Sequence, residues 1–188
     1  ISQQKRIQDR RKVLSEIFNK DLDSSALEYQ ALFALHTSYS IILKIIAYRV
    51  VSDVHFGQRL QNFKSLSTID SESLRAFCYG LEDGDVFRNI GILNLLEGDF
   101  FSWYADKAQW NSNLAKSIQE ILNILSRYED INDVFSSTNA IDLFRELYEA
   151  TVPQVVRGGF GEFYTPHWLA QHVLLSSKAK SNSSILDP

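Results

Sequence analysis

The apolar segment from Ala26 to Val54 limits the possible folds of this chain more than any other feature. Its apolar residues recur every three to five positions, which is the spacing of an α-helix with one wide apolar face. That face consists of Leu27, Leu32, Leu35, Tyr39, Ile42, Ile46 and Val50. Because Lys44 and Arg49 interrupt the run, it falls short of the roughly 20 apolar residues that span a bilayer. We therefore expect a buried central helix and no association with a membrane.

Further amphipathic segments predict that residues 1–150 form a helical domain. Ser25 with Glu28 three residues later matches a capping box, which predicts the start of the central helix. Helical periodicity continues in several other segments. They are residues 3–19, 71–79, 86–96, 112–128 and 140–150, with a loop expected at 57–71. The predicted fold class is therefore mainly α up to residue 150.

Composition narrows the class of protein. The 188 residues suffice for a real core, and the apolar and charged fractions of 45% and 22% are ordinary for a globular chain. The net charge of −4 gives no overall attraction to nucleic acid, so DNA affinity would need a local basic patch or parts of the protein outside this chain. Cys78 is the single cysteine, which excludes an internal disulfide and a cysteine zinc cluster. It favours a reducing, cytoplasmic location.

The first predicted helix concentrates positive charge. It contains Lys5, Arg6, Arg10, Arg11 and Lys12 among apolar residues. Such a helix can bind DNA phosphates, can simply present a solvated face, or can connect to a preceding domain. The chain starts at Ile1 and has no methionine, so we expect the natural N-terminus to precede it.

Three other features admit a functional and a structural interpretation, and the structural one is favoured for each. His36 lacks a second histidine or a carboxylate four residues on, so we expect a hydrogen-bonded core histidine. The aromatic run at 99–104 can stack a nucleobase, but is more typical of core packing. The acidic run at 82–85 lacks the ligand spacing of a calcium loop and predicts a solvated turn; no metal site is expected.

The stretch from Gly158 to Pro166 combines a glycine turn, an aromatic pair and a Thr-Pro step. Thr165 is a favourable N-cap, and proline is tolerated in the first helical turn. We therefore predict that Thr165 caps a helix beginning at Pro166. The predicted apolar face holds Trp168, Leu169, His172, Val173 and Leu175. The start of such a helix attracts an anion such as a carboxylate or phosphate.

The segment Gly-Glu-Phe-Tyr-Thr-Pro at 161–166 resembles motif X of the DNA adenine-N6 methyltransferases of restriction–modification systems. The resemblance extends through the next helix, a polar linker and a β-like run at 184–186 that ends in Asp187-Pro188. More loosely, 32–39 and 101–104 resemble the helical N-terminal region of that family. The resemblance implies that residues 151–188 begin a class I methyltransferase α/β domain, truncated here before its glycine-rich turn.

The same resemblance implies a binding site for S-adenosylmethionine. Thr165 would contact the methionine end of the cofactor, Phe163 and Tyr164 would wall the pocket, and Asp187 would belong to the first cofactor motif. The implied cofactor-binding residues are Glu162, Phe163, Tyr164, Thr165, Pro166 and Asp187. The implied activity is methyl transfer to adenine N6 in double-stranded DNA, with a nuclease domain or specificity subunit as further partners.

The family's catalytic Pro-Pro-Tyr/Phe segment does not occur in this chain, whose prolines are Pro153, Pro166 and Pro188. We therefore assign no catalytic residue and expect this fragment alone to be inactive. A Glu-x-Lys nuclease pair is also lacking, so any nuclease would lie upstream. Two alternatives stay open: a non-enzymatic α-helical interaction module, and a methyltransferase that acts on RNA or protein.

Overall fold

The computed structural model is mainly α-helical in the part of the chain that it describes. That part comprises residues 3–55, 61–89, 91–93, 101–128, 143–161, 164–178, 180 and 183–184. These ranges hold nine α-helices, two short 3-10 helices and no strand. The expectation of a mainly α fold is thus confirmed for these ranges. The predicted strand at 184–186 falls almost entirely outside them.

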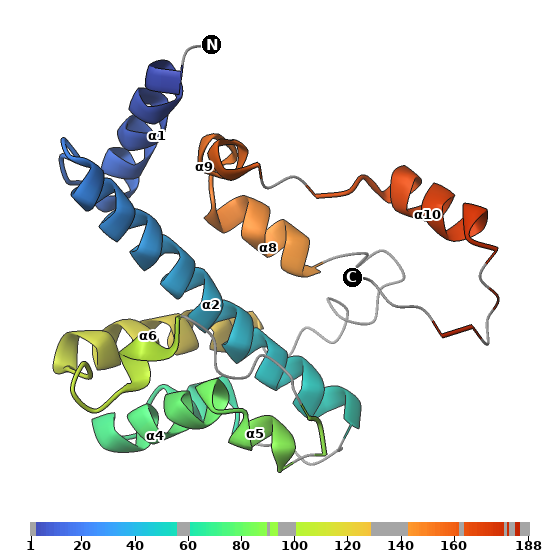
Figure 1. Cartoon of the computed structure of the whole chain (residues 1–188). Coiled ribbons are helices and arrows are strands. Elements are labelled where there is room, and N and C mark those ends of the chain that lie inside the picture. The colour runs from blue at the N-terminus through green and yellow to red at the C-terminus, as the bar shows by residue number, and fades with distance from the viewer. Residues whose placement is uncertain are drawn as a thin grey trace.

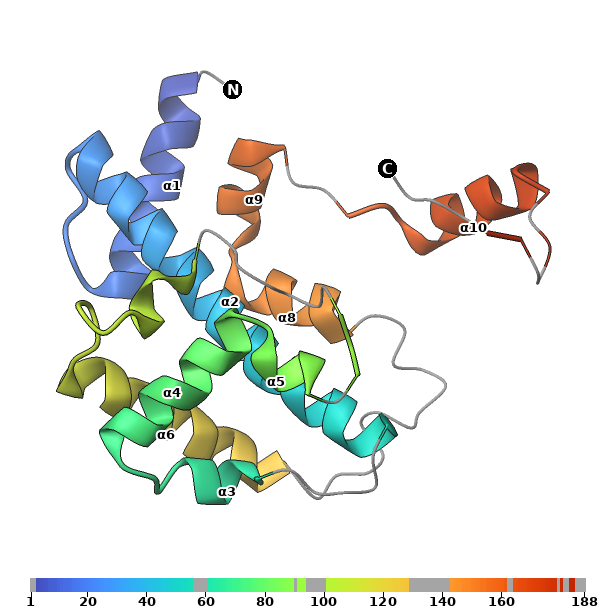
Figure 2. The same ribbon diagram turned by 60° about the horizontal axis from the view of Figure 1, so that its bottom comes forward.

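The helices surround one long diagonal helix, α2. Their bounds are α1 (Gln3–Phe18), α2 (Ser25–His55), α3 (Phe63–Leu66), α4 (Ser71–Glu82), α5 (Asp85–Arg88), η1 (Ser102–Ala105), α6 (Ser112–Leu125), η2 (Ser126–Tyr128), α8 (Leu143–Thr151), α9 (Gln154–Phe160) and α10 (His167–Ser176). Figures 1 and 2 show α4, α5 and α6 on one side of α2 and α8 and α9 on the other. Helix α10 extends away from this body.

Helix α2 is the predicted central helix, although the length argument against a membrane span was wrong. By length and composition alone, its segment Ser25–Val51 could cross a bilayer. However, 56% of its most apolar window is buried inside the protein, as in the core helix of a soluble fold. The buried Lys44 side chain also forms an ion pair with Glu82 of α4. Burial and this pair, not length, support the core-helix interpretation.

The start of α2 differs from the predicted capping box. The Ser24 hydroxyl, not that of Ser25, accepts the backbone N–H of Leu27, at 3.3 Å. Glu28 therefore lies one position too late to complete the box. Its carboxylate binds Arg10 and Arg11 of α1 instead, so an interaction between helices replaces the local cap.

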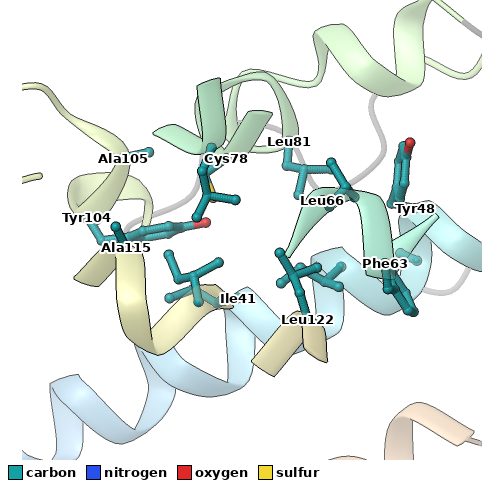
Figure 3. Packing of buried hydrophobic residues seen from close by; sticks show 14 of the residues in the cluster. Ile41, Tyr48, Phe63, Leu66, Cys78, Leu81, Tyr104, Ala105, Ala115 and Leu122 are labelled. Atoms are coloured by element: carbon teal, nitrogen blue, oxygen red, sulfur yellow. The ribbon is translucent and has the colours of Figure 1, made fainter. Parts of the chain in front are cut away.

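The larger hydrophobic core lies between α2, α3, α4, α6 and η1 (Figure 3). Its fully buried members include Ile45, Leu66, Leu74, Cys78, Leu81, Tyr104, Ile118 and Leu122. Side-chain caps define where two of these helices begin: Asp70 accepts N–H groups at the start of α4, and Asn111 does so for α6. The helix predicted at 112–128 is confirmed as α6 followed by η2.

A smaller hydrophobic core connects α1 and the first half of α2 with the region between α8 and α9. Leu14 of α1 and Leu32 and Leu35 of α2 pack with Val152 and Val156, which lie around the start of α9. Val152 and Val156 are fully buried. Val152 and Val156, which follow position 151, therefore share a core with the N-terminal helices, and Tyr148, which precedes it, packs against this core.

Two local predictions were wrong. Gly158 and Gly159 belong to α9 instead of a turn, and only Gly161 takes the left-handed conformation that ends this helix, with φ 75°. The helix predicted at 86–96 is described only as the single turn α5, and Gly91 has φ 85° beyond it. A positive φ at Gly91 is incompatible with continuing an α-helix through that residue.

Candidate functional site

The candidate site centres on the connection between α9 and α10. Tyr164, Thr165 and Pro166 lie there in an exposed, non-helical segment (Figure 1). Glu162, Phe163 and Asp187, the other residues implied by the resemblance, lie outside the described residues. The structure therefore describes three of the six implied cofactor-binding residues, and these three are consecutive in the chain.

Gly161 directs the chain out of α9 and into this segment. Its φ of 75° and ψ of 19° are left-handed, and its N–H donates to the carbonyl of Arg157. Glycine adopts this conformation without the steric cost that a Cβ atom would cause. The glycine of the motif therefore has a local structural role, independent of any ligand.

The prediction that Thr165 caps α10 was wrong. Pro166 occupies the N-cap position, with φ −57° and ψ 142°, and no side chain caps the helix. Pro166 has an extended ψ instead of a helical one, so the helix begins at His167 and Thr165 lies one position ahead of the cap. The carbonyl of Pro166 accepts the N–H groups of Leu169 and Ala170, at 2.9 and 3.0 Å.

Tyr164 connects this segment to the helical body. Its ring lies edge-on to that of Tyr148 in α8, with 5.9 Å between centroids and 72° between planes. The guanidinium of Arg145 lies 5.6 Å from the Tyr164 ring centroid, within the range of a cation–π contact. The roles of Tyr148 and Arg145 could not be predicted, because nothing local in the sequence pairs them with residue 164.

Helix α10 has an apolar sequence but buries none of its residues. Trp168 and Leu175 are 68% and 72% exposed, and Val173 and Leu174 are each at least half exposed. Monomeric soluble proteins rarely leave apolar residues contiguous on their surface, and such patches usually mark contact sites. Of the predicted apolar face, Leu169 is partly buried and the other four residues face solvent.

The structural interpretations of His36 and the aromatic run are supported where these residues are described. His36 Nδ1 donates to the carbonyl of Leu32 at 2.8 Å, and its ring stacks on Phe101 at 6.0 Å. Trp103 Nε1 donates to Thr37 Oγ1 at 3.1 Å, and Tyr104 is fully buried. Residues 101–104 thus hold α2 against its neighbours, while 99 and 100 lie outside the described part.

The acidic turn at 82–85 is only partly solvated, which corrects the prediction. Asp83 and Asp85 lie at the surface and both bind Arg88, at 2.7 Å. Glu82 instead points inward, pairs with Lys44 and accepts a hydrogen bond from the Tyr104 hydroxyl at 2.7 Å. Among the described residues, no group of three or more histidine, cysteine or acidic side chains is arranged to hold a metal ion.

The basic patch on α1 is reduced by pairing. Arg10 Nε lies 2.5 Å and Arg11 Nε 2.7 Å from opposite oxygens of the buried Glu28 carboxylate. Arg11 also donates to the Ser25 hydroxyl at 2.9 Å. Lys5, Arg6 and Lys12 remain exposed. Two of the five predicted phosphate contacts therefore have a structural role.

Three cavities with described linings lie away from the Tyr164–Pro166 segment. The cavity beside the acidic turn, about 200 Å³, is lined by Tyr79, Glu82, Asp83, Ser102 and Asp106. The others lie between α3 and α6 and beside the start of α2.

In a comparison with known proteins, no family model, curated protein or solved structure matches this chain.

Proposed function

We propose that this chain is the N-terminal part of a DNA methyltransferase that transfers a methyl group from S-adenosylmethionine to adenine N6 in a restriction–modification or defence system. The observation that carries the proposal is the exposed Tyr164–Pro166 segment, which leads directly into the uncapped start of α10. The residues of this segment are those that resemble motif X of the adenine-N6 methyltransferases.

The chemistry of this segment fits the methionine end of the cofactor. The first N–H groups of an α-helix lack partners inside the helix, and the helix dipole favours an anion there. No side chain caps the ten-residue helix α10, so its first turn can receive the carboxylate of S-adenosylmethionine. Thr165 is exposed one residue before the cap and can add its hydroxyl as a further donor.

The exposed apolar surface of α10 also supports the proposal. In an α/β domain, helices bury one apolar side against a sheet. We assign α10 to the methyltransferase domain, whose sheet would cover Trp168 and Leu175. Residues 1–160 then form a helical body beside that domain, and catalysis depends on residues outside this chain, so the chain by itself is inactive.

Cofactor binding is the first test. Titration of the complete natural protein with S-adenosylmethionine in a calorimeter should show one site. Replacing Thr165 with Val should weaken binding about tenfold, the loss expected for one hydrogen bond to a charged group. Thr68→Val is the control, because Thr68 is also exposed and its hydroxyl donates to the local carbonyl of Ser65.

Two results of this titration would contradict the proposal. One is the absence of binding by the complete protein. The other is clear micromolar binding by residues 1–188 alone, because a pocket with one wall should bind weakly.

Transfer of labelled methyl groups tests the substrate. The label should appear at N6 of adenine in duplex DNA, whereas label in RNA or protein would favour the alternative methyltransferases.

The exposed side of α10 also fits the alternative of an α-helical interaction module. In that case the complete protein would bind no S-adenosylmethionine, and α10 would be covered by a separate partner chain. Alanine replacement of Trp168 and Leu175 would then abolish partner binding. In the methyltransferase, the same replacements should destabilise the complete protein itself.

A further inference from the structure

We infer that Tyr148 of α8 is a positioning residue, which holds the Tyr164–Pro166 segment and the start of α10 in place against α2. This inference rests on the proposed function for its effect on the cofactor, but the positioning itself is a structural statement. Tyr148 is half-buried and carries no sequence motif.

Tyr148 contacts aromatic rings from two other parts of the chain. On one side it meets two residues of α2: Tyr39 edge-on, with centroids 5.0 Å apart, and His36 at 6.5 Å. On the other side it meets Tyr164 edge-on at 5.9 Å. Edge-on pairs are favoured because the positive edge of one ring faces the negative face of the other. Tyr148 therefore bridges the central helix and the candidate segment.

Charged residues of α8 add to the contact between Tyr148 and Tyr164. Arg145, one turn before Tyr148, lies over the Tyr164 ring, and its Nε donates to Glu149 at 3.3 Å. Glu149 also pairs with Arg157 of α9 at 3.7 Å. Arg157 in turn donates to the carbonyl of Val152, in the buried connection between α8 and α9. Arg145 is thereby oriented by both helices that precede the segment.

Helix α10 contributes little to its own placement, because none of its residues is buried. Tyr164 lies two residues before the N-cap Pro166, and the proline ring restricts the backbone between them. The Tyr164 contacts therefore set the position of the first N–H groups of α10. If Tyr148 is lost, these groups should sample more positions, and only a fraction of them will suit the cofactor carboxylate.

Hydrogen exchange of the complete protein tests the positioning without reference to activity. In Tyr148→Ala, the amides of Leu169 and Ala170, which donate to the carbonyl of Pro166, should exchange faster than in the wild type, while those of α6 stay unchanged. Tyr148→Phe keeps the ring and should restore wild-type exchange. Tyr29→Ala is the matched control, because Tyr29 is a tyrosine of α2 that is 63% exposed.

Cofactor kinetics provide the second readout. Tyr148→Ala should raise the KM for S-adenosylmethionine about tenfold with little change in kcat, since positioning affects the fraction of competent sites. Tyr148→Phe should recover the wild-type KM. If Tyr148→Ala does not fold, Tyr164→Ala removes the same contact from its exposed partner and should give the same exchange pattern.

The outcomes separate the inference from the proposed function. Unchanged exchange at Leu169 and Ala170 in Tyr148→Ala would overturn the positioning role, even if the complete protein binds the cofactor. Failure of the wild-type protein to bind S-adenosylmethionine would overturn the function and leave the exchange result to decide the positioning role. A fall in kcat alone would also contradict positioning.

Discussion

Glu82 and its two acidic neighbours show how residues of the same type can have opposite environments. Asp83 and Asp85 face solvent beside Arg88, whereas the Glu82 side chain is 4% exposed and that of Lys44 is 1% exposed. A buried charge costs much free energy unless it is paired and hydrogen-bonded. Lys44 and the Tyr104 hydroxyl provide these partners.

Removing one member of this pair should therefore cost more than removing both charges. Lys44→Met leaves a buried carboxylate without its counter-ion and should lower the free energy of unfolding by about 3–5 kcal/mol. Adding Glu82→Gln removes that charge and keeps an oxygen to accept from Tyr104, so part of the loss should be recovered. Urea unfolding of the single and the double variant measures both free energies of unfolding. A double variant less stable than Lys44→Met would contradict the interpretation.

Cys78 provides a second prediction at the residue scale. Burial, and then the charge of Glu82, raise the pKa of its thiol from 9.0 to about 12. Above pH 9 the unfolded chain loses this proton while the folded chain keeps it. The stability contribution of the thiol is therefore complete below pH 9 and falls as the pH rises toward 12.

Two measurements check this. The thiol should react slowly with a disulfide reagent at pH 8 in the folded protein and quickly in urea, because the thiolate is the reactive form. Cys78→Ala should lose less stability than the wild type between pH 9 and pH 11. Rapid labelling of the folded protein would show that the thiol is accessible, and equal pH dependence of the two proteins would show that folding does not raise its pKa.

At the scale of elements, α1 and α9 meet at Gly159. A Cβ atom there would lie 2.8 Å from Nη1 of Arg10, which is closer than such contacts allow. Arg10 is also held by the Glu28 carboxylate. The glycine therefore allows α9 to approach an arginine that already links α1 to α2.

The effect of Gly159→Ala on stability should thus depend on whether Arg10 is present. In the wild-type background the new methyl displaces Arg10 from Glu28, and this loss offsets the helix propensity gained, about 1 kcal/mol. In Arg10→Ala the methyl meets no guanidinium, and Gly159→Ala should stabilise. A double-mutant cycle by thermal unfolding should give a coupling of about 1–2 kcal/mol. Additive effects would mean that α1 and α9 do not interact through these residues.

Helix α10 differs from the other long helices because none of its residues is buried in the described part of the chain. If the methyltransferase assignment is correct, the rest of the natural protein covers it. Iodide should then quench the fluorescence of Trp168 strongly in the 188-residue chain and weakly in the complete protein. The Trp168→Phe variants supply the background from Trp103 and Trp110. Equal quenching in both proteins would mean that α10 stays exposed.

For the whole molecule, the sequence predicted the helical class, the central helix and helices close to the observed α1 and α6. These elements depend on residues three or four positions apart, so their pattern is visible locally. The sequence also predicted a helix beginning at Pro166, and the structure begins it one residue later, at His167. It assigned the cap to Thr165, whereas Pro166 keeps an extended ψ of 142° and occupies the N-cap position itself.

The tertiary structure decided which side chains meet. Glu28 turned from a capping residue into the partner of two arginines, Glu82 became buried, and Tyr148 came to lie against Tyr164. Tyr39 and Tyr148 are more than 100 positions apart in the chain and form one contact. Local periodicity carries no information about such pairs, because they exist only after helices distant in the sequence have packed together.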